Sequence, residues 1–525
     1  MKKIATLLLA AGLVFGTTTG ASAIDFKVKG EWIMSFDYGQ NGRMTGGNGG
    51  TGWNNRGAGR ASDEFEAVQR LRLRLDAVAS ESLSGTVHFE IGDTTWGSDR
   101  PGVNSSYGGA LGADGNSVEL KNAYIDWTPS NMDLKIRMGI QGLSLPSFTT
   151  GSQVFNHDAA GITLNYRFND NVSLTGFWVR AYNDNYAGGD NLGHTVNANY
   201  LDNFDVAALI LPLTFDEVKI SPWIMGGIVG PNSGGKYFNS TTGASSGDIR
   251  AGMVPVGGAL RKDGTPSGKY LNEYGSAFWA GATGDITAWD PFRIAFDVNY
   301  GAIAWAEDGR LNRSGWLASL LFTYKLDWAV PGIYGWYSTG DDSDPSNGSE
   351  RMPTFTTIHT NNGFSSFAFN GQPWIPEGGR DNVLGRTMIG TWGVGARLKD
   401  MSFINDLKHT FRVNYIGGTN SPTFARRYLA GNNSGNGRKA IFDNISGPNA
   451  YELGMDPLYL TTRDSALEIG LANEYQVYEN FKIYFEGSYL AAFIDKSVWK
   501  HSQMNGKNDQ VRDPWNINLT FIYSF

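Results

Sequence analysis

The 525-residue sequence contains no cysteine, so the chain needs no disulfide partner and cannot be trapped by one in an oxidising compartment. It also lacks any run of about twenty consecutive apolar residues, which excludes a helical membrane anchor. What it has in abundance is glycine (69 residues), tyrosine (23) and tryptophan (16), with a mean hydropathy of −0.29. A membrane barrel can look this hydrophilic because only half of each strand faces lipid, although a soluble β-solenoid or sandwich could share the composition.

The first 23 residues have the layout of a secretory signal peptide. Lys2 and Lys3 precede a short apolar run at 4–15, and Ala21-Ser22-Ala23 forms a small-residue cleavage site. We therefore expect residues 1–23 to be removed on export, and residues 24–525 to form a single domain.

Apolar and polar residues alternate in about eighteen segments of that domain, from 25–38 to 513–525. Successive side chains of a strand point to opposite faces, so each segment would have one apolar and one polar face. Short turns such as 289–290 alternate with long loops such as 340–386. This layout predicts an all-β, transmembrane antiparallel β-barrel with short periplasmic turns and long extracellular loops. Sixteen strands is the alternative to eighteen, because the patterns at 196–211 and 330–339 are weak, and segment 118–128 has mixed parity.

The last eleven residues carry the clearest strand pattern. Their apolar or aromatic positions recur at every second residue and would face lipid: Trp515, Ile517, Leu519, Phe521, Tyr523 and the terminal Phe525. Tryptophans lie near the ends of the predicted strands and would form two interfacial girdles: Trp32, Trp127, Trp289, Trp328 and Trp515 beside short turns, and Trp305 and Trp316 beside a long loop.

The most chemically distinctive segment is 65–75, in which arginines alternate with leucines. Arg70, Arg72 and Arg74 share one face, about 7 Å apart per step. Facing lipid at mid-depth they would cost roughly 2–4 kcal/mol each, so we expect them to line the lumen. There they could bind carboxylate, sulfate or phosphate, or pair with lumen acids to hold the shape of the barrel. Both roles stay open from the sequence.

Three further residues are candidates for the pore lining. Arg137 and Arg412 alternate inward on their strands, as does Asp297 on the eleventh strand. In an eighteen-strand order Asp297 lies across from the arginines of the second strand, which would give the lumen a transverse field.

The stretch 134–147 resembles the strand that leads into the third, inward-folding loop of trimeric general porins. With the signal peptide and the terminal strand, it makes the chain similar to Gram-negative outer-membrane trimeric porins, closest to the homotrimeric porins of sulfate-reducing bacteria. The resemblance implies a homotrimer in the cell outer membrane, a loop at 142–157 that narrows the pore, and recognition of the terminal strand (Trp515, Leu519, Phe521, Tyr523, Phe525) by the barrel-assembly machinery. That loop usually carries acids in the family, whereas 142–157 has none, so the constriction would be basic.

These features predict a passive outer-membrane channel for small hydrophilic solutes, with a preference for anions such as sulfate or small organic acids. The alternatives are an eighteen-stranded porin specific for a sugar or organic acid, and a barrel enzyme. The six histidines lie in no recognisable nucleophile or metal motif, so we predict no catalytic residue, metal site or cofactor, and we expect no nucleic-acid partner. The acidic segment 341–350 could gather calcium ligands, but its spacing favours a solvated loop tip.

Overall fold

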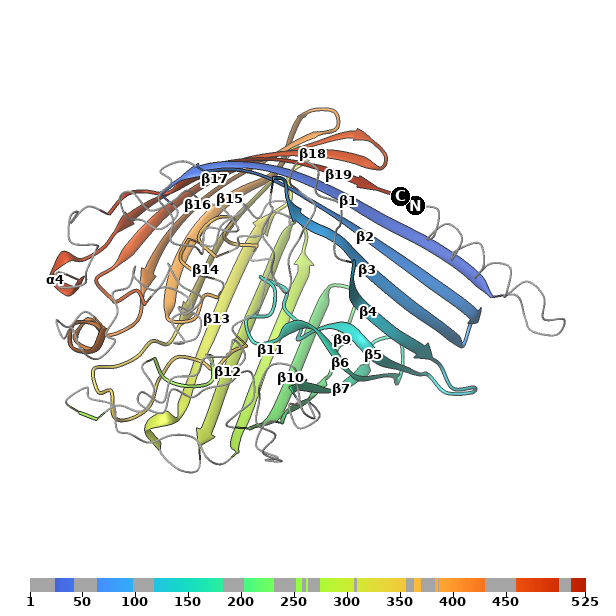
Figure 1. The fold of residues 1–525 in the computed structure, drawn as a ribbon, viewed down its shortest axis with the longest axis horizontal. Helices are drawn as coiled ribbons and strands as arrows, with labels where there is room; N and C mark the ends of the chain where they lie inside the picture. The colour runs from blue at the N-terminus through green and yellow to red at the C-terminus, as the bar shows by residue number, and fades with distance from the viewer. Residues whose placement is uncertain are drawn as a thin grey trace.

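The computed structural model describes residues 24–41, 64–97, 118–182, 203–230, 252–256, 261–262, 274–305, 309–355, 363–369, 383–385, 387–429, 459–499 and 511–525. The signal peptide predicted at 1–23 lies outside the described residues. The strands form one antiparallel sheet that curls on itself, with β1 hydrogen-bonded to both β2 and β19 (Figure 1). No helix among the described residues is long and apolar enough to cross a membrane.

The strand segments follow one another round the wall in chain order. They are β1 (Asp25–Gln40), β2 (Glu64–Ser80), β3 (Leu83–Thr95), β4 (Val118–Trp127), β5 (Leu134–Ser144), β6 (Asn156–Arg167), β7 (Ser173–Tyr182), β8 (Phe204–Ile210), β9 (Leu213–Thr214), β10 (Val218–Val229), β11 (Gly275–Trp289), β12 (Phe292–Trp305), β13 (Arg313–Tyr324), β14 (Val330–Ser338), β15 (Thr391–Ile404), β16 (Leu407–Gly418), β17 (Ser465–Tyr478), β18 (Phe481–Phe493) and β19 (Trp515–Ser524). Short helical pieces lie in the connections: η3 (Gly309–Leu311), α3 (Pro422–Phe424), η4 (Ala425–Leu429) and α4 (Lys496–Trp499).

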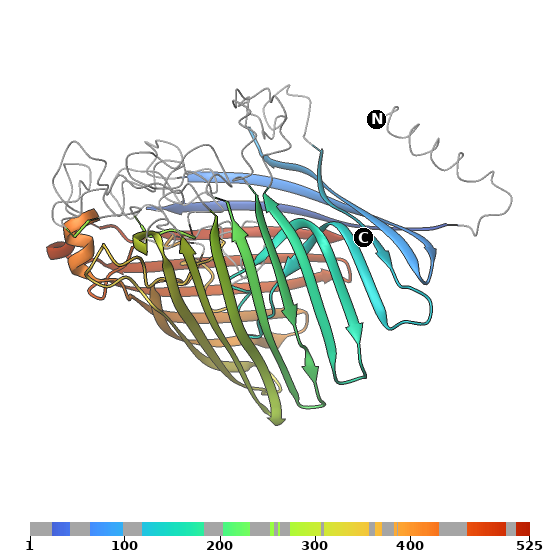
Figure 2. The same cartoon turned by 90° about the horizontal axis from the view of Figure 1, so that it is seen from below.

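Segments β8 and β9 are two halves of one strand. Both pair with β10, at Trp223↔Ile210 and Ile220↔Leu213, and the break between them contains Pro212. Proline has no backbone N–H to give to the ladder, so the strand is interrupted there. The nineteen segments are therefore eighteen strands, which confirms the prediction of a closed, antiparallel eighteen-stranded barrel. Short turns connect the strands at one end and long loops at the other (Figure 2).

The mixed parity of 118–128 is the result of a bulge in β4. His88 of β3 pairs with Asn122, and the next residue, Phe89, pairs with Leu120, so Lys121 is the extra residue. A bulge of one residue reverses the alternation beyond it. As a result Leu120 and Ile125 both lie on the exposed outer face despite their opposite parity.

The outer wall is apolar and the inner side is packed. Exposed tryptophans lie at both ends of the wall, as predicted, at positions 32, 127, 289, 328 and 316. Two girdle predictions are wrong. Trp305 is buried inside, and its indole Nε1 donates to the carbonyl of Met253 at 3.3 Å. Trp515 starts β19 and pairs with Gln40 and Tyr489, so it lies at the long-loop end of the wall and not beside a short turn. The terminal strand alternates as expected, and Phe525 exchanges both backbone hydrogen bonds with Gly30 of β1, at 2.7 and 2.9 Å.

Candidate functional site

The connection between β5 and β6 folds into the barrel and reaches the opposite wall. Asp297 of β12 accepts hydrogen bonds from the Ser147 hydroxyl at 2.6 Å and from the backbone N–H groups of Phe148 and Thr149 at 3.1 and 3.2 Å. The hydroxyls of Thr149 and Thr283 donate to the same carboxylate. A carboxylate that accepts this many bonds holds a loop firmly, because each donor would be unsatisfied without it.

The predicted bounds of this loop are 142–157. Strand pairing continues through Ser144 and resumes at Asn156, so the irregular part is 145–155. Asp297 is only 3% exposed, and the loop covers it. Asp297 was predicted to form a negative wall of the open lumen; in the structure it instead anchors the loop.

A second loop, 363–369 between β14 and β15, is held in the same manner by a second acid. Glu468 of β17 accepts hydrogen bonds from the backbone N–H groups of Ser366 and Phe367 at 2.9 and 2.8 Å, and from the Ser365 hydroxyl at 3.1 Å. Its other oxygen accepts from the amide of Asn414 at 2.9 Å. Two acids on different strands thus fix two loops inside the barrel.

Arg313 of β13 provides a third anchor, through carbonyls instead of N–H groups. Its buried guanidinium donates to the carbonyl oxygens of Arg351 and Met352 at 3.0 Å and of Val254 at 3.2 Å. This role could not be predicted from the sequence, because an arginine at the start of a strand has the same pattern whether it binds loops or solvent.

Apolar side chains fill the space between these loops and the inner wall. Phe355 makes aromatic contacts with Phe155 of the first loop, Phe204 of β8 and Trp279 of β11, with ring centroids 5.0, 5.3 and 5.8 Å away. The same buried cluster extends through inner-wall residues from β7 to β18. Much of the lumen beside these strands is therefore occupied by protein.

The wall formed by β2 to β5 carries the partly exposed charges. Arg72 Nε lies 2.8 Å from Glu90 Oε2, and Arg74 Nε lies 2.9 Å from Asp76 Oδ1. Arg70 is buried, with Nη1 3.8 Å from the same Glu90 oxygen. Arg70, Arg72 and Arg74 thus form a row on one face of β2, as predicted, and each of them has an acidic neighbour.

Asp126 of β4 forms a third paired group on this wall. Arg137 of β5 binds it with two bonds, at 2.6 and 2.8 Å, and stacks 4.0 Å above the ring of Tyr124. Lys135 Nζ lies 2.9 Å from its second oxygen. Asp126 could not be predicted as a lumen residue, because the bulge at Lys121 hides the inward parity of this part of β4.

Four of these cations are more exposed than the acids they pair with, whereas Arg70 (6%) is less exposed than Glu90 (16%). Side-chain exposure is 27% for Arg72 against 16% for Glu90, and 43% for Arg74 against 15% for Asp76. Arg137 (29%) and Lys135 (49%) likewise exceed Asp126 (15%). Five cations (Arg70, Arg72, Arg74, Lys135 and Arg137) share three acids (Glu90, Asp76 and Asp126), so these groups carry a formal charge of +2, and all of the cations except Arg70 expose more of their side chains than the acids do.

Lys121 of β4 and Asp158 of β6 form an ion pair beyond the point where β4 and β5 stop pairing. Strands β4 and β5 pair from Trp127↔Ile136 to Ala123↔Ile140. Beyond this pairing, Lys121 forms an ion pair with Asp158 of β6, and the Asn122 amide donates to the same carboxylate at 2.9 Å. This arrangement ties β6 to β4 where β5 turns inward toward the loop.

Arg412, the remaining predicted pore residue, lies on β16 opposite Arg397 of β15 and is only 3% exposed. Arg397 Nη1 donates to the carbonyl of Gly363 at 2.9 Å, so this pair of arginines faces the second loop. The structure therefore separates the six predicted residues into two groups. Arg72, Arg74 and Arg137 face the remaining lumen, whereas Arg70, Arg412 and Asp297 are buried.

The acidic segment 341–350 is satisfied by protein donors. Asp344 accepts from Ser346, which holds the pKa of that carboxyl below its usual range, and burial raises the pKa of Glu350. Asp341 accepts from the hydroxyls of Ser349 and Tyr459, the latter at 2.8 Å. No group of three or more potential metal ligands occurs among the described residues.

No family model matches this sequence, and no curated protein matches it. Solved structures similar to it include that of Acinetobacter baumannii OccAB2, with 10% identity, a TM-score of 0.49, and coverage of 95% of this chain and 98% of that one. Pseudomonas aeruginosa OpdQ (11% identity, TM-score 0.45) and OpdK with vanillate (8%, 0.46) are each covered to 98%, over 95% of this chain. At identities of 8–11% and TM-scores below 0.5, this likeness carries no conclusion about solutes or partners.

Proposed function

We propose that this protein is a passive outer-membrane channel that is selective for small organic anions, such as carboxylates. The barrel has the apolar outer face and the polar, charged inner residues of a transmembrane channel. This proposal takes the substrate-specific alternative in preference to a general diffusion pore.

One observation carries the proposal: on the β2–β5 wall the side chains of Arg72, Arg74, Lys135 and Arg137 are more exposed than those of the acids they pair with. An anion that enters can accept from Arg72, Arg74 and Arg137 without breaking their pairs, because each guanidinium has five N–H donors. Guanidinium groups also bind carboxylates with matched geometry.

Selectivity among solutes also depends on the protein that fills part of the barrel interior. Asp297 and Glu468 hold two loops inside, and the aromatic cluster fills the space behind them. A narrowed lumen lets a solute contact the charged wall as it passes, which a wide water-filled pore would not require. A sugar track of exposed aromatics is less well supported, because inward-facing Trp279, Trp305 and Trp336 are buried.

The test is the reversal potential of the purified protein in a planar bilayer under a KCl gradient. We expect chloride selectivity, and we expect the Arg72→Glu variant to reverse or flatten it, since the substitution replaces an exposed cation with an anion beside Glu90. A gradient of small carboxylates should give the same sign as chloride.

Arg167→Gln is the matched control, because Arg167 is an exposed arginine at the short-turn end of β6, paired with Asp133 and Asp170 at 3.8 Å. It should leave the reversal potential unchanged. Potassium selectivity of the unmodified protein would contradict the proposal, as would an equal effect of both substitutions.

The terminal strand supports a second part of the proposal, recognition by the barrel-assembly machinery. Trp515, Leu519, Phe521 and Tyr523 line the outer face of β19, and Phe525 extends the pairing with β1 to the last residue. Removal of Phe525 should lower the amount of folded barrel in outer-membrane fractions, while refolding of the purified chain in detergent should proceed.

A further inference from the structure

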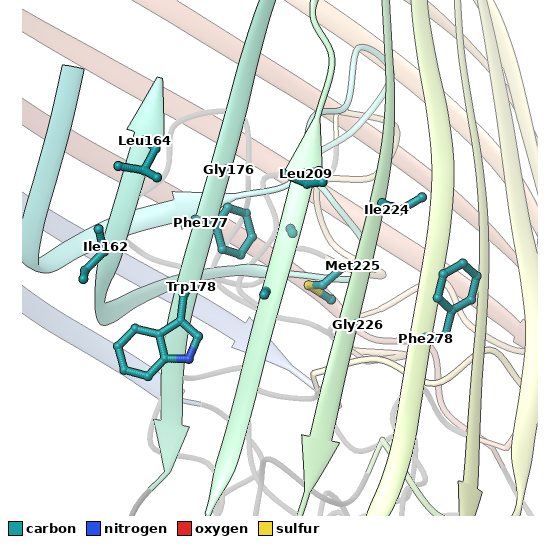
Figure 3. Close-up of a pocket in the computed structure, with 12 residues that line it drawn as sticks. Ile162, Leu164, Gly176, Phe177, Trp178, Leu209, Ile224, Met225, Gly226 and Phe278 are labelled. Atoms are coloured by element: carbon teal, nitrogen blue, oxygen red, sulfur yellow. The ribbon is translucent and has the colours of Figure 1, made fainter. Parts of the chain in front are cut away.

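The outer wall contains an apolar groove with a volume of about 710 Å³, formed by β6, β7, β8, β10 and β11 (Figure 3). Strand register explains its shape. One row across the wall reads Trp178–Ala207–Gly226–Phe278, in which each residue is paired with the next. Two large rings therefore stand at the sides of a floor of two small residues.

The next row toward the short turns closes the groove. It reads Gly176–Leu209–Ile224, so large side chains follow the small floor along β8 and β10. Leu209 and Ile224 are about half exposed on the outer face.

On the other side of the floor, toward the long loops, the next row reads Arg180–Asp205–Ile228–Ser276, so it places charged residues over β7 and β8 and an apolar side chain over β10. Arg180 and Asp205 are paired across β7 and β8, two residues beyond Trp178 and Ala207, which is roughly 7 Å along the wall. The Arg180 guanidinium binds Asp205 with two bonds, at 2.9 and 3.0 Å, and lies 5.8 Å from the Trp178 ring. Asp205 takes two of its five N–H donors, so three remain for another acceptor.

From this juxtaposition we propose that the groove holds one acyl chain of a phosphate-bearing lipid of the outer leaflet, with the phosphate bound by Arg180. Water is excluded from an apolar hollow at this depth, and a flexible hydrocarbon chain fits a narrow floor between two rings. Arginine binds phosphate with several donors at once, and Trp178 beside it is a residue type that prefers the headgroup level.

The inference rests on the membrane placement proposed above and not on the solute. It therefore needs a measurement that does not involve conductance. The probes are lipid A and the same lipid with its phosphates removed, added to delipidated protein in a neutral detergent and detected as bound mass by native mass spectrometry.

We expect the unmodified protein to retain one lipid A molecule. Gly226→Leu should abolish retention of both lipids by filling the floor; a Cβ at Gly226 meets no neighbouring atom closer than the Ala277 carbonyl at 4.0 Å, so the wall itself tolerates the change. Arg180→Gln should weaken lipid A binding about tenfold, to the level of the dephosphorylated lipid, because a charged hydrogen bond is lost.

Ala396→Leu is the matched control, because Ala396 is exposed on the outer face of β15, away from the groove. It should retain lipid A as the unmodified protein does. Equal retention by Gly226→Leu, equal loss in Ala396→Leu, or competition by inorganic phosphate alone would overturn the proposal. Dissociation of an oligomer by Gly226→Leu without loss of lipid would also overturn it, since the groove would then be a subunit interface.

Discussion

At the scale of single residues, two inward carboxylates decide the shape of the lumen. Asp297 and Glu468 are each surrounded by donors of a loop that is distant in sequence, including pairs of adjacent backbone N–H groups. Such clustered N–H groups form a concavity that favours an anion. The acid and its loop therefore act as one unit, and removal of the acid leaves several buried donors without an acceptor.

Asp297→Ala should release loop 145–155 from β12. Each buried donor left unsatisfied costs about 1–3 kcal/mol, so the loop should leave its site while the barrel, held by the strand ladders, stays folded. Single-channel recordings should show a larger and noisier conductance. Asp327→Ala, which removes an exposed carboxylate in the turn between β13 and β14, is the control. An unchanged conductance in Asp297→Ala would contradict the anchoring role.

At the scale of elements, β14 and β15 form the support of the second loop. Gly393 and Gly395 leave room on the inner face for the rings of Trp336 and Tyr334; an added Cβ would lie 2.2 and 2.4 Å from their ring atoms. Tyr334 stacks on Phe364 of the loop with centroids 4.3 Å apart, and its hydroxyl donates to the Phe364 carbonyl at 2.9 Å. The absence of side chains on one strand thus positions aromatic rings on its neighbour.

Gly395→Ala should disturb this support, because its methyl group would also meet the side-chain oxygen of Asn414 at 2.1 Å. Tyr334 and Asn414 are both buried, so neither can move aside without losing a bond to the Phe364 carbonyl. Overpacking of this kind typically costs 1–3 kcal/mol. Unfolding of the barrel on heating changes its electrophoretic mobility, and Gly395→Ala should show this change at a lower temperature than the control Gly487→Ala. At Gly487 no atom lies within 4 Å of the added Cβ. Equal transitions would refute the supporting role.

At the scale of the whole molecule, the homotrimer implied by the porin resemblance stays a prediction. The outer wall is apolar over much of its circumference, and lipid or a second copy could cover such a surface. Native mass spectrometry of the protein in neutral detergent should show three copies. A monomer at every protein concentration would contradict it and would leave the proposed channel function untouched.

The sequence by itself determined the barrel. One face of each membrane strand contacts lipid and the other contacts water or the packed interior, so apolar and polar residues alternate along the strand. The sequence thereby predicted the strand count, the alternation of turns and loops, and the row of Arg70, Arg72 and Arg74. It failed where local geometry breaks the period, at the bulge of Lys121, and where an inward aromatic such as Trp305 meets protein in place of water.

Only the tertiary structure decided what occupies the lumen. Asp297 and the loop at 147–149 are about 150 residues apart, and alternation shows that a side chain points inward without showing what it meets there. The pairing of Arg72 with Glu90 and of Arg137 with Asp126 depends on register between neighbouring strands, which a one-residue bulge can shift. The proposed selectivity of the wall rests on the greater exposure of Arg72, Arg74, Lys135 and Arg137 relative to their acids, and that exposure is a property of packing.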